Sequence, residues 1–261
     1  MLSGIDPATW PMIVLVSSRV GGLFITAPLW SMLDIPKTVR VALVFLISAA
    51  LVPGTLQGAG PTEAAATVGP MAAEMLIGLA IGLSAAAFLH GITLAGEVVS
   101  VQAGLNLGPA LSPMANESVG GLGQAQTLLA TSIYVSMGGH LTLLEGLARS
   151  LQVIPPGQAP DLAGGARIAT ALGGIVFSTG IRAAAPIMVA LLLTNLALAI
   201  LSKAVPQMSA MSVAFPITLS VGLLMFAASL PFFAMMVSRW AAGLAGGVDS
   251  TIGAFAPLVA R

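Results

Sequence analysis

Five ionisable residues interrupt long apolar stretches of this sequence and are the first candidates for chemistry: Arg19, Glu74, His90, Glu97 and Arg182. Charged groups at membrane depth are costly, and they usually face protein or water. Such groups can form an ion or proton pathway, or they can pair with neighbours and line a subunit interface. The sequence has no run of acids or histidines that would form a relay, so pairing is the favoured interpretation and a pathway is the alternative.

No catalytic motif accompanies these residues. The two histidines, His90 and His140, lack the HExxH spacing of a zinc site, and no GxxxxGK[ST] nucleotide loop is present. Ser84 and His140 could form the nucleophile and base of an intramembrane protease, but the nucleophile turn of that chemistry is missing. Glu97 and Asp249, as a catalytic acid pair, also lack a supporting motif. We therefore expect no enzyme activity, cofactor or metal.

The composition indicates a membrane protein. Hydrophobic residues make up 57% of the 261 residues and charged residues only 7%, whereas soluble domains carry about 25% charged residues. The apolar runs are long and continuous, which favours helices over the alternating strands of a barrel. Zero net charge gives no indication of a nucleic-acid partner, and the absence of cysteine excludes disulfides.

Six apolar blocks predict an all-α membrane protein with about six partly broken helices, at residues 10–33, 39–57, 70–95, 122–148, 168–203 and 211–244. About 20 residues cross a bilayer core, so the last two blocks are overlong and should kink, break or leave the bilayer. Prolines supply the expected breakers, at Pro186, Pro206, Pro216 and Pro231. The first block lacks a basic n-region, so we expect it to be a retained helix.

Loop charges predict no simple topology. Lys37 and Arg40 favour a cytoplasmic loop after the first block, and Lys203 would lie on the same face. Six spans would nevertheless place four arginines on the opposite face, which are Arg149, Arg167, Arg239 and Arg261. Either the topology is unusual or some helices do not cross the bilayer.

The third block carries a row of residues at four-residue steps: Glu74, Gly78, Gly82, Ala86 and His90. Residues four apart lie on nearly the same side of a helix. The GxxxG pair lets another helix approach closely. The row therefore predicts one crowded, protein-facing surface. Small residues are also frequent in the other blocks, which favours a subunit of a larger membrane assembly.

The segment Gly96–Gly121, GEVVSVQAGLNLGPALSPMANESVGG, is too rich in glycine and proline for a helix core and too apolar for a solvated loop. Irregular backbone at membrane depth must be buried in protein or line a cavity. A pore plug and a structural interface loop both meet this condition. Glu97 and Gln102 stand at its root, where they could fix it by hydrogen bonds.

Four stretches, in order along the chain, together resemble the FliR family of flagellar and injectisome type III export gates: Arg19–Leu43, Gly96–Pro113, Gly138–Leu147 and Leu191–Met225. They correspond to the TAP step of the family's first helix, its GE…Q segment, its NGH step and its NLALGLLNR…APQ block. The sequence departs from the family where Asn106-Leu107 replaces Ser-Phe and where Ser112 replaces an aspartate.

The resemblance implies a non-catalytic, single-copy subunit of a helical pore complex at the bacterial inner membrane, in the flagellar basal body. Its partners would be FliP-, FliQ- and FlhB-type membrane proteins and membrane lipid, and its cargo unfolded exported proteins. It also implies bent helical hairpins in one membrane domain, 1–261, with a FliP-like half, 1–165, and a FliQ-like hairpin, 166–261.

The resemblance further implies that the loop at about 104–121 plugs the pore, and this assigns Gly104, Leu105, Asn106, Leu107, Gly108, Pro109, Leu111, Pro113 and Met114 to the plug. The remaining candidates are intramembrane polar or interface residues: Arg19, Glu74, Gly78, Gly82, His90, Glu97, Gln102, Arg182, Pro186, Lys203 and Gln207. A small-solute secondary transporter is the alternative function, because broken helices and intramembrane charges suit a midplane site. An injectisome in place of a flagellar gate is the other alternative.

Overall fold

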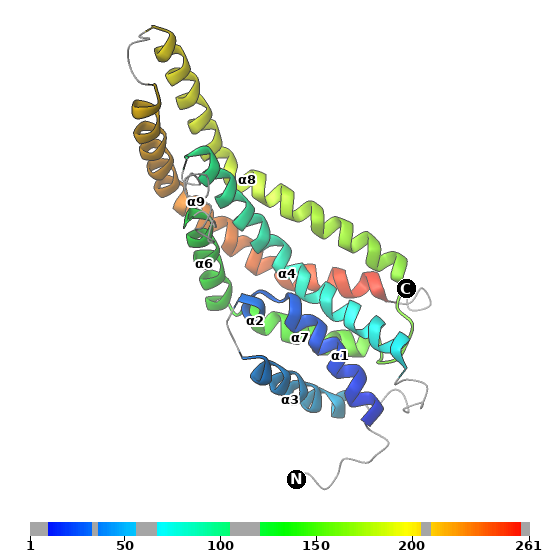
Figure 1. Cartoon of the computed structure of the whole chain (residues 1–261). Coiled ribbons are helices and arrows are strands. Elements are labelled where there is room, and N and C mark those ends of the chain that lie inside the picture. Colours follow the sequence, from blue (N-terminus) through cyan, green and yellow to red (C-terminus); the bar gives the residue numbers. More distant parts are fainter. Residues whose placement is uncertain (1–9, 33–35, 56–66, 105–120, 205–209, 257–261) are drawn as a thin grey trace. The chain divides into compact units, whose positions relative to one another are not determined.

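The computed structural model describes residues 10–32, 36–55, 67–104, 121–204 and 210–256, and over these ranges the chain is helical without a strand (Figure 1). The elements are α1 (Trp10–Thr26), α2 (Pro28–Met32), α3 (Lys37–Thr55), α4 (Val68–Gln102), α6 (Gly121–Ser136), α7 (Gly139–Val153), α8 (Leu162–Ala204) and α9 (Ala210–Phe255). The all-α prediction is confirmed.

Four helices are long and apolar enough to cross a membrane: α3, α4, α8 and α9. The pair α6 and α7 gives a fifth candidate span with a bend at its break. At this break Gly138 takes a left-handed φ of 75°, a conformation that glycine adopts without the steric cost of a Cβ. The first and fourth predicted blocks are thus each two helices, since Pro28 begins α2 and Gly138 separates α6 from α7.

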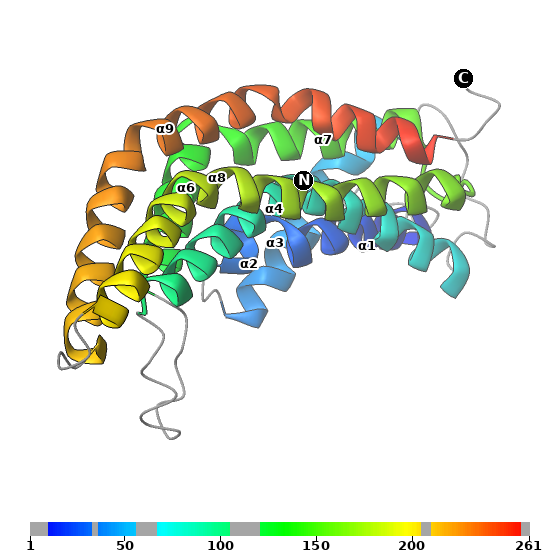
Figure 2. The same ribbon diagram turned by 90° about the horizontal axis from the view of Figure 1, so that it is seen from above.

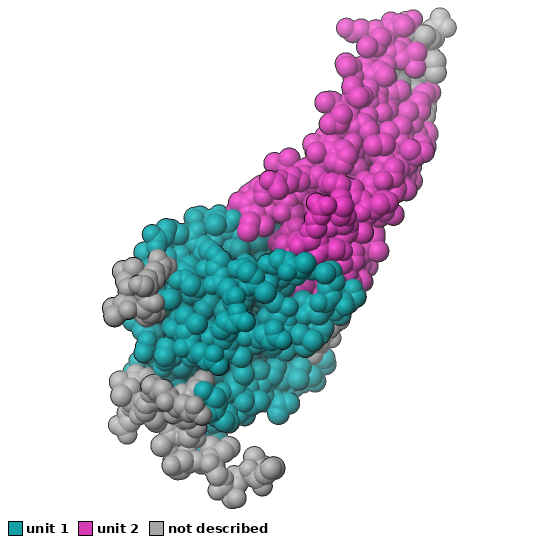
Figure 3. All heavy atoms as spheres, turned by 180° about the vertical axis from the view of Figure 1, so that it is seen from behind, with its two compact units in different colours: residues 1–87, 135–173, 241–261 teal, residues 88–134, 174–240 magenta. Residues whose placement is uncertain are grey.

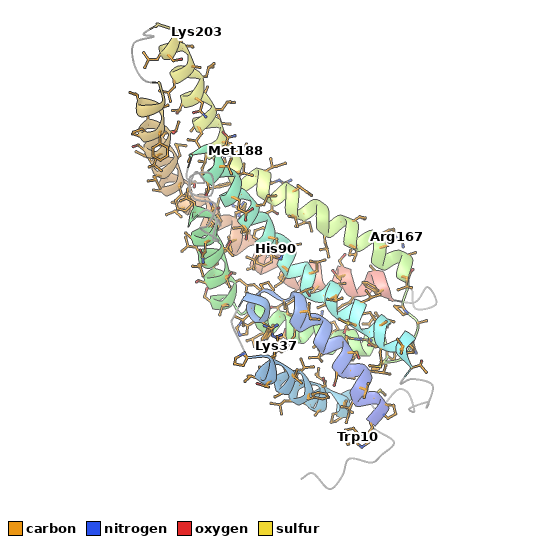
Figure 4. All side chains as sticks on the ribbon, viewed as in Figure 1. Trp10, Lys37, His90, Arg167, Met188 and Lys203 are labelled. Carbon is orange, nitrogen blue, oxygen red and sulfur yellow. The ribbon has the colours of Figure 1, made fainter. Side chains whose placement is uncertain are left out.

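Three of the four prolines expected to kink or break the last two blocks lie within helices that continue past them. Pro186 lies inside α8, and Pro216 and Pro231 lie inside α9, while Pro206 falls outside the described residues. An interior proline removes one helical hydrogen bond and produces a kink, but the bonds on either side hold the helix together. Accordingly, α8 changes direction in the region of Met188 (Figure 4), and α9 curves along its orange part (Figure 2).

The third block is also longer than predicted, because α4 continues through Gly96 to Gln102. Gly96 therefore lies within a helix, at a contact with another helix, and does not begin a loop. A Cβ at Gly96 would collide with the Cα of Gly123 and the amide oxygen of Gln126. The missing side chain therefore lets α6 lie against α4.

The chain forms two compact units, and each draws on distant segments (Figure 3). Unit 1 comprises residues 1–87, 135–173 and 241–261, and unit 2 comprises 88–134 and 174–240. The helices α4, α8 and α9 contribute residues to both. The proposed boundary at residue 165 remains a prediction.

Unit 1 includes α1, whose apolar side chains from Met12 to Phe24 are mostly buried. Its neighbour α3 runs beside it (Figure 1). The start of α8 is fixed by Asp161, because its Oδ1 accepts a 3.0 Å hydrogen bond from the amide of Gly164. This is the bond of an aspartate N-cap. The amide of Asp161 in turn donates to the carbonyl of Phe255 at 3.1 Å, which attaches this cap to the end of α9.

Two apolar clusters lie in the described part of unit 2. One joins α4 to α8 around Val99, Ile187 and Leu191. The other joins α4, α6 and α9, where the ring of Phe88 stacks on Trp240 with centroids 4.3 Å apart. Between α4 and α6 the hydroxyls of Thr93 and Thr127 lie 2.7 Å apart. Lipid chains offer hydroxyl groups no hydrogen-bond partner, so such a bond between two helices satisfies both groups.

Candidate functional site

The most complete polar arrangement in the described part of the chain is a buried ion pair between Arg19 and Glu74. Arg19 Nε lies 2.5 Å from Glu74 Oε2, and both side chains are at most 1% exposed. Arg19 Nη1 donates to Ser150 Oγ at 3.1 Å, and Nη2 donates to the carbonyl of Ile154 at 2.9 Å. The amide of Gly157 donates to Glu74 Oε1 at 2.9 Å. Each polar edge of the pair therefore has a partner.

This arrangement connects four separate parts of unit 1. Arg19 comes from α1, Glu74 from α4 and Ser150 from α7, while Ile154 and Gly157 belong to the segment between α7 and α8. Buried charges persist only where pairing and hydrogen bonds offset their lost hydration. A fully satisfied pair of this kind fixes geometry, and it offers no free proton acceptor for a relay. The structure therefore agrees with the pairing interpretation of these two residues.

The predicted glycine ridge forms the surface on which α1 lies. A Cβ at Gly78 would fall within bonding range of the Arg19 carbonyl oxygen, and a Cβ at Gly82 would collide with Thr26 and Ala27. Gly22 of α1 lies at the same contact between α1 and α4, because a Cβ added there would collide with the backbone of Met75. The small residues thus serve close packing between two helices of one chain.

Of the predicted row, Glu74 and Ala86 are buried together with the two glycines. His90 does not share this environment, because it is exposed in the single chain. The row from Glu74 to Ala86 thus lies in the packed interior of the chain, while an interface role for His90 stays a prediction. A drift of about 40° for each four-residue step accounts for the difference, since the row spirals away from one side of the helix.

The other predicted polar residues lie outside the ion-pair arrangement. Glu97, Arg182, Pro186 and Lys203 are exposed in the single chain, and Gln102 is partly buried. Gln207 lies outside the described residues, as do the plug candidates Leu105, Asn106, Leu107, Gly108, Pro109, Leu111, Pro113 and Met114. An interface role for the exposed residues stays a prediction.

The root of the predicted plug is described as far as Gly104, which follows the end of α4. Gly104 has a φ of 77°, in the region that a residue with a Cβ enters at a cost. The ring of Phe215 in α9 lies beside it. Ala103 is fully buried, and a Cβ on Gly222 of α9 would touch its methyl group. The chain is therefore held firmly against α9 at the point where the predicted plug begins.

Sequence reasoning missed Ser150 and Gly22. Ser150 belongs to the buried face of α7, which also carries Leu143, Gly146 and Leu147 at helical spacing. That periodicity marks the buried face, but an isolated serine does not reveal that an arginine 131 residues away will donate to it. Gly22 lies one helical turn after Arg19, and this spacing alone could have suggested that Gly22 also lies at the contact between α1 and α4.

Comparison with known proteins decides the family. The sequence profile of the bacterial export proteins, family 1, matches residues 10–243. The chain belongs to this family, the FliR family. It is 29% identical to the flagellar biosynthetic protein FliR of Escherichia coli K12 over 233 residues, which cover 89% of this chain and 87% of that protein. FliR of Caulobacter vibrioides is 28% identical, with 85% and 89% covered, and FliR of Bacillus subtilis is 26% identical, with 83% and 85% covered.

Membership of the FliR family confirms the resemblance and makes the chain a multi-pass membrane protein of flagellar export, in a non-enzymatic family. The protease alternative finds no support in the geometry. The Ser84 hydroxyl donates to the carbonyl of Ile81, one turn earlier in its own helix, at 2.6 Å. Asp249, the other acid considered, lies 2.6 Å from Arg149 in an exposed ion pair.

Proposed function

We propose that the chain is a structural subunit of the flagellar protein export gate. With FliP-, FliQ- and FlhB-type proteins it would form the central pore through which unfolded flagellar substrates cross the bacterial inner membrane. Its place would be the flagellar basal body. The relatives named above are all flagellar, which supports this over the injectisome.

The observation that carries this proposal is the length and exposure of the last two helices. α8 has 43 residues and α9 has 46, so α8 alone is about 65 Å long at 1.5 Å per residue. The hydrocarbon core is only about 30 Å thick. Yet only 17% of the most apolar part of α8 and 11% of that of α9 are buried within the chain. Apolar surface longer than the bilayer needs partner proteins to cover it.

Two features support the proposed division into halves and the plug. α8 and α9 are consecutive long helices joined by residues 205–209, as a FliQ-like hairpin requires. Gly104 turns the chain at the end of α4, directly before the segment proposed as the plug. We propose that residues 104–121 close the pore and that the exposed Arg182 and Lys203 face partner subunits.

The transporter alternative has no comparable support. A midplane substrate site needs ionisable groups gathered around broken helices. Arg19 and Glu74, the most deeply buried ions among the described residues, instead satisfy each other, and α8 and α9 continue through their prolines.

Deleting residues 106–117 should make the closed gate permeable to ions while leaving the complex assembled. The reason is that a plug contributes to closure, whereas the packing of α4 and α9 is complete by Ala103 and Gly222. Ion conductance of membranes that contain the assembled gate is the measurement. A deletion of similar length between α3 and α4, within 56–66, is the control and should leave conductance low. Unchanged conductance in the 106–117 variant, with normal complex yield, would contradict the plug.

A further inference from the structure

An apolar groove lies between α1 and α3 in unit 1, and nothing in the described part of the chain fills it. Its cavity volume is about 420 Å³. The residues that line it and bear on its occupant are Val14, Gly21 and Ile25 of α1, Val41 and Phe45 of α3, and Met71 of α4. Val41 and Phe45 remain about half exposed. The groove is thus a strip of hydrocarbon surface open to an apolar occupant.

A cation lies at one place along this groove. Arg40, in the first turn of α3, also lines the cavity. Its Nη2 donates to the carbonyl of Trp30 at 3.0 Å, while its Nε is buried without a hydrogen-bond partner. The hydroxyl of Ser17, on the α1 side, is likewise buried without a partner. A buried donor of a charged group that lacks an acceptor is costly, so the groove is suited to an occupant with acceptor oxygens.

We infer that this groove binds one anionic phospholipid, with an acyl chain along α1 and α3 and its phosphate at Arg40. The volume of about 420 Å³ limits the part of the occupant that lies inside the groove. One helical turn with its side chains, about 10 Å wide and 5.4 Å long, already occupies about 400 Å³, so the groove has room for a single turn. The charge argues for an anionic headgroup, because guanidinium groups pair with phosphate through parallel N–H···O bonds. This inference does not depend on the proposed export role.

The groove offers a filling variant that leaves the backbone unstrained. A Cβ added to Gly21 meets no atom within 4 Å, so Gly21→Leu would occupy the space of the acyl chain. Gly173→Leu is the matched control, because Gly173 also has open space around it and lies on α8, away from the groove. Arg40→Gln removes the charge, and Arg239→Gln is its control, since Arg239 is an exposed arginine of α9.

The full chain, purified in mild detergent with the subunits that accompany it, is titrated with phosphatidylglycerol and separately with phosphatidylcholine. Native mass spectrometry counts the bound lipids. We expect Gly21→Leu to bind one lipid fewer than Gly173→Leu, with either lipid. We expect Arg40→Gln to retain lipid binding but to lose a preference of about fivefold for phosphatidylglycerol, the contribution of one basic residue at an anionic surface.

Equal lipid counts for Gly21→Leu and Gly173→Leu would overturn the inference. A photocrosslinking side chain at Val41 gives an independent result that does not require the glycine variant to fold. Crosslinks to phosphatidylglycerol are expected. Crosslinks to a protein subunit alone would show that a neighbouring chain occupies the groove and would also overturn the inference.

Discussion

Replacing Glu74 with methionine is expected to destabilise unit 1 by about 3–5 kcal/mol, the cost of leaving one member of a buried ion pair without its partner. Arg19 would stay fully buried with a charge that only Ser150 and the Ile154 carbonyl could solvate. The amide of Gly157 would lose its acceptor as well. The midpoint of denaturant unfolding of the purified chain, followed by circular dichroism in detergent, measures the loss.

Two comparisons show whether the pair acts as a unit. The double variant Arg19→Met/Glu74→Met removes both charges, so it should recover part of the loss, because buried pairs are often replaceable by apolar groups of similar volume. Arg149→Met breaks the exposed pair with Asp249, whose side chains are 52% and 44% exposed, and should cost at most about 1 kcal/mol. A double variant less stable than either single one would show that the two charges do not compensate each other.

The second large effect is expected where α1 crosses the glycine ridge. Gly78→Ala places a methyl group on the backbone carbonyl of Arg19, and backbone cannot move aside as a flexible side chain can. Forcing a methyl group into a closed contact typically costs about 1–3 kcal/mol. The same step would displace Arg19 from Glu74, so we expect a loss at the upper end of that range or beyond. Denaturant unfolding and the yield of assembled complex both report it.

Gly69→Ala is the matched control for this substitution. Gly69 belongs to the same helix, and a Cβ there meets nothing within 4 Å. Alanine is favoured over glycine by about 0.5–1 kcal/mol in a helix interior, and part of this gain applies at Gly69 in the first turn of α4. The two substitutions should therefore shift stability in opposite directions. Equal effects would mean that the seam between α1 and α4 is looser than the structure describes.

The pattern of glycines explains which parts of the fold could be predicted from sequence. Gly78 and Gly82 lie in a regular four-residue row, so a close helix contact was predictable, although its partner, α1, was not. Gly96 has no such companion in its own helix, and it was read as the start of a loop. Its role depends on Gly123, which approaches from another helix. The sequence shows where small residues recur along a helix, but only the contacts in the folded chain show which helix each of them approaches.

The candidate site shows the same limit. Their place in apolar stretches marked Arg19 and Glu74 as charged residues that need partners. They are 55 residues apart in the sequence, and no spacing rule pairs residues over that distance. The prolines left open whether a helix kinks or breaks: at Pro186 the helix continues for a further 18 residues, to Ala204. In a long helix the bonds on either side of a proline outweigh the one that it removes.

The central claim, that the chain is a structural subunit of an export gate, is tested most directly by purification of a tagged copy that replaces the native chain in its bacterium. The account predicts a stable complex with a fixed ratio of FliP-, FliQ- and FlhB-type membrane proteins, whose subunits cover the exposed apolar lengths of α8 and α9. Recovery of a folded chain without these subunits, active in moving a small solute across reconstituted vesicles, would contradict it.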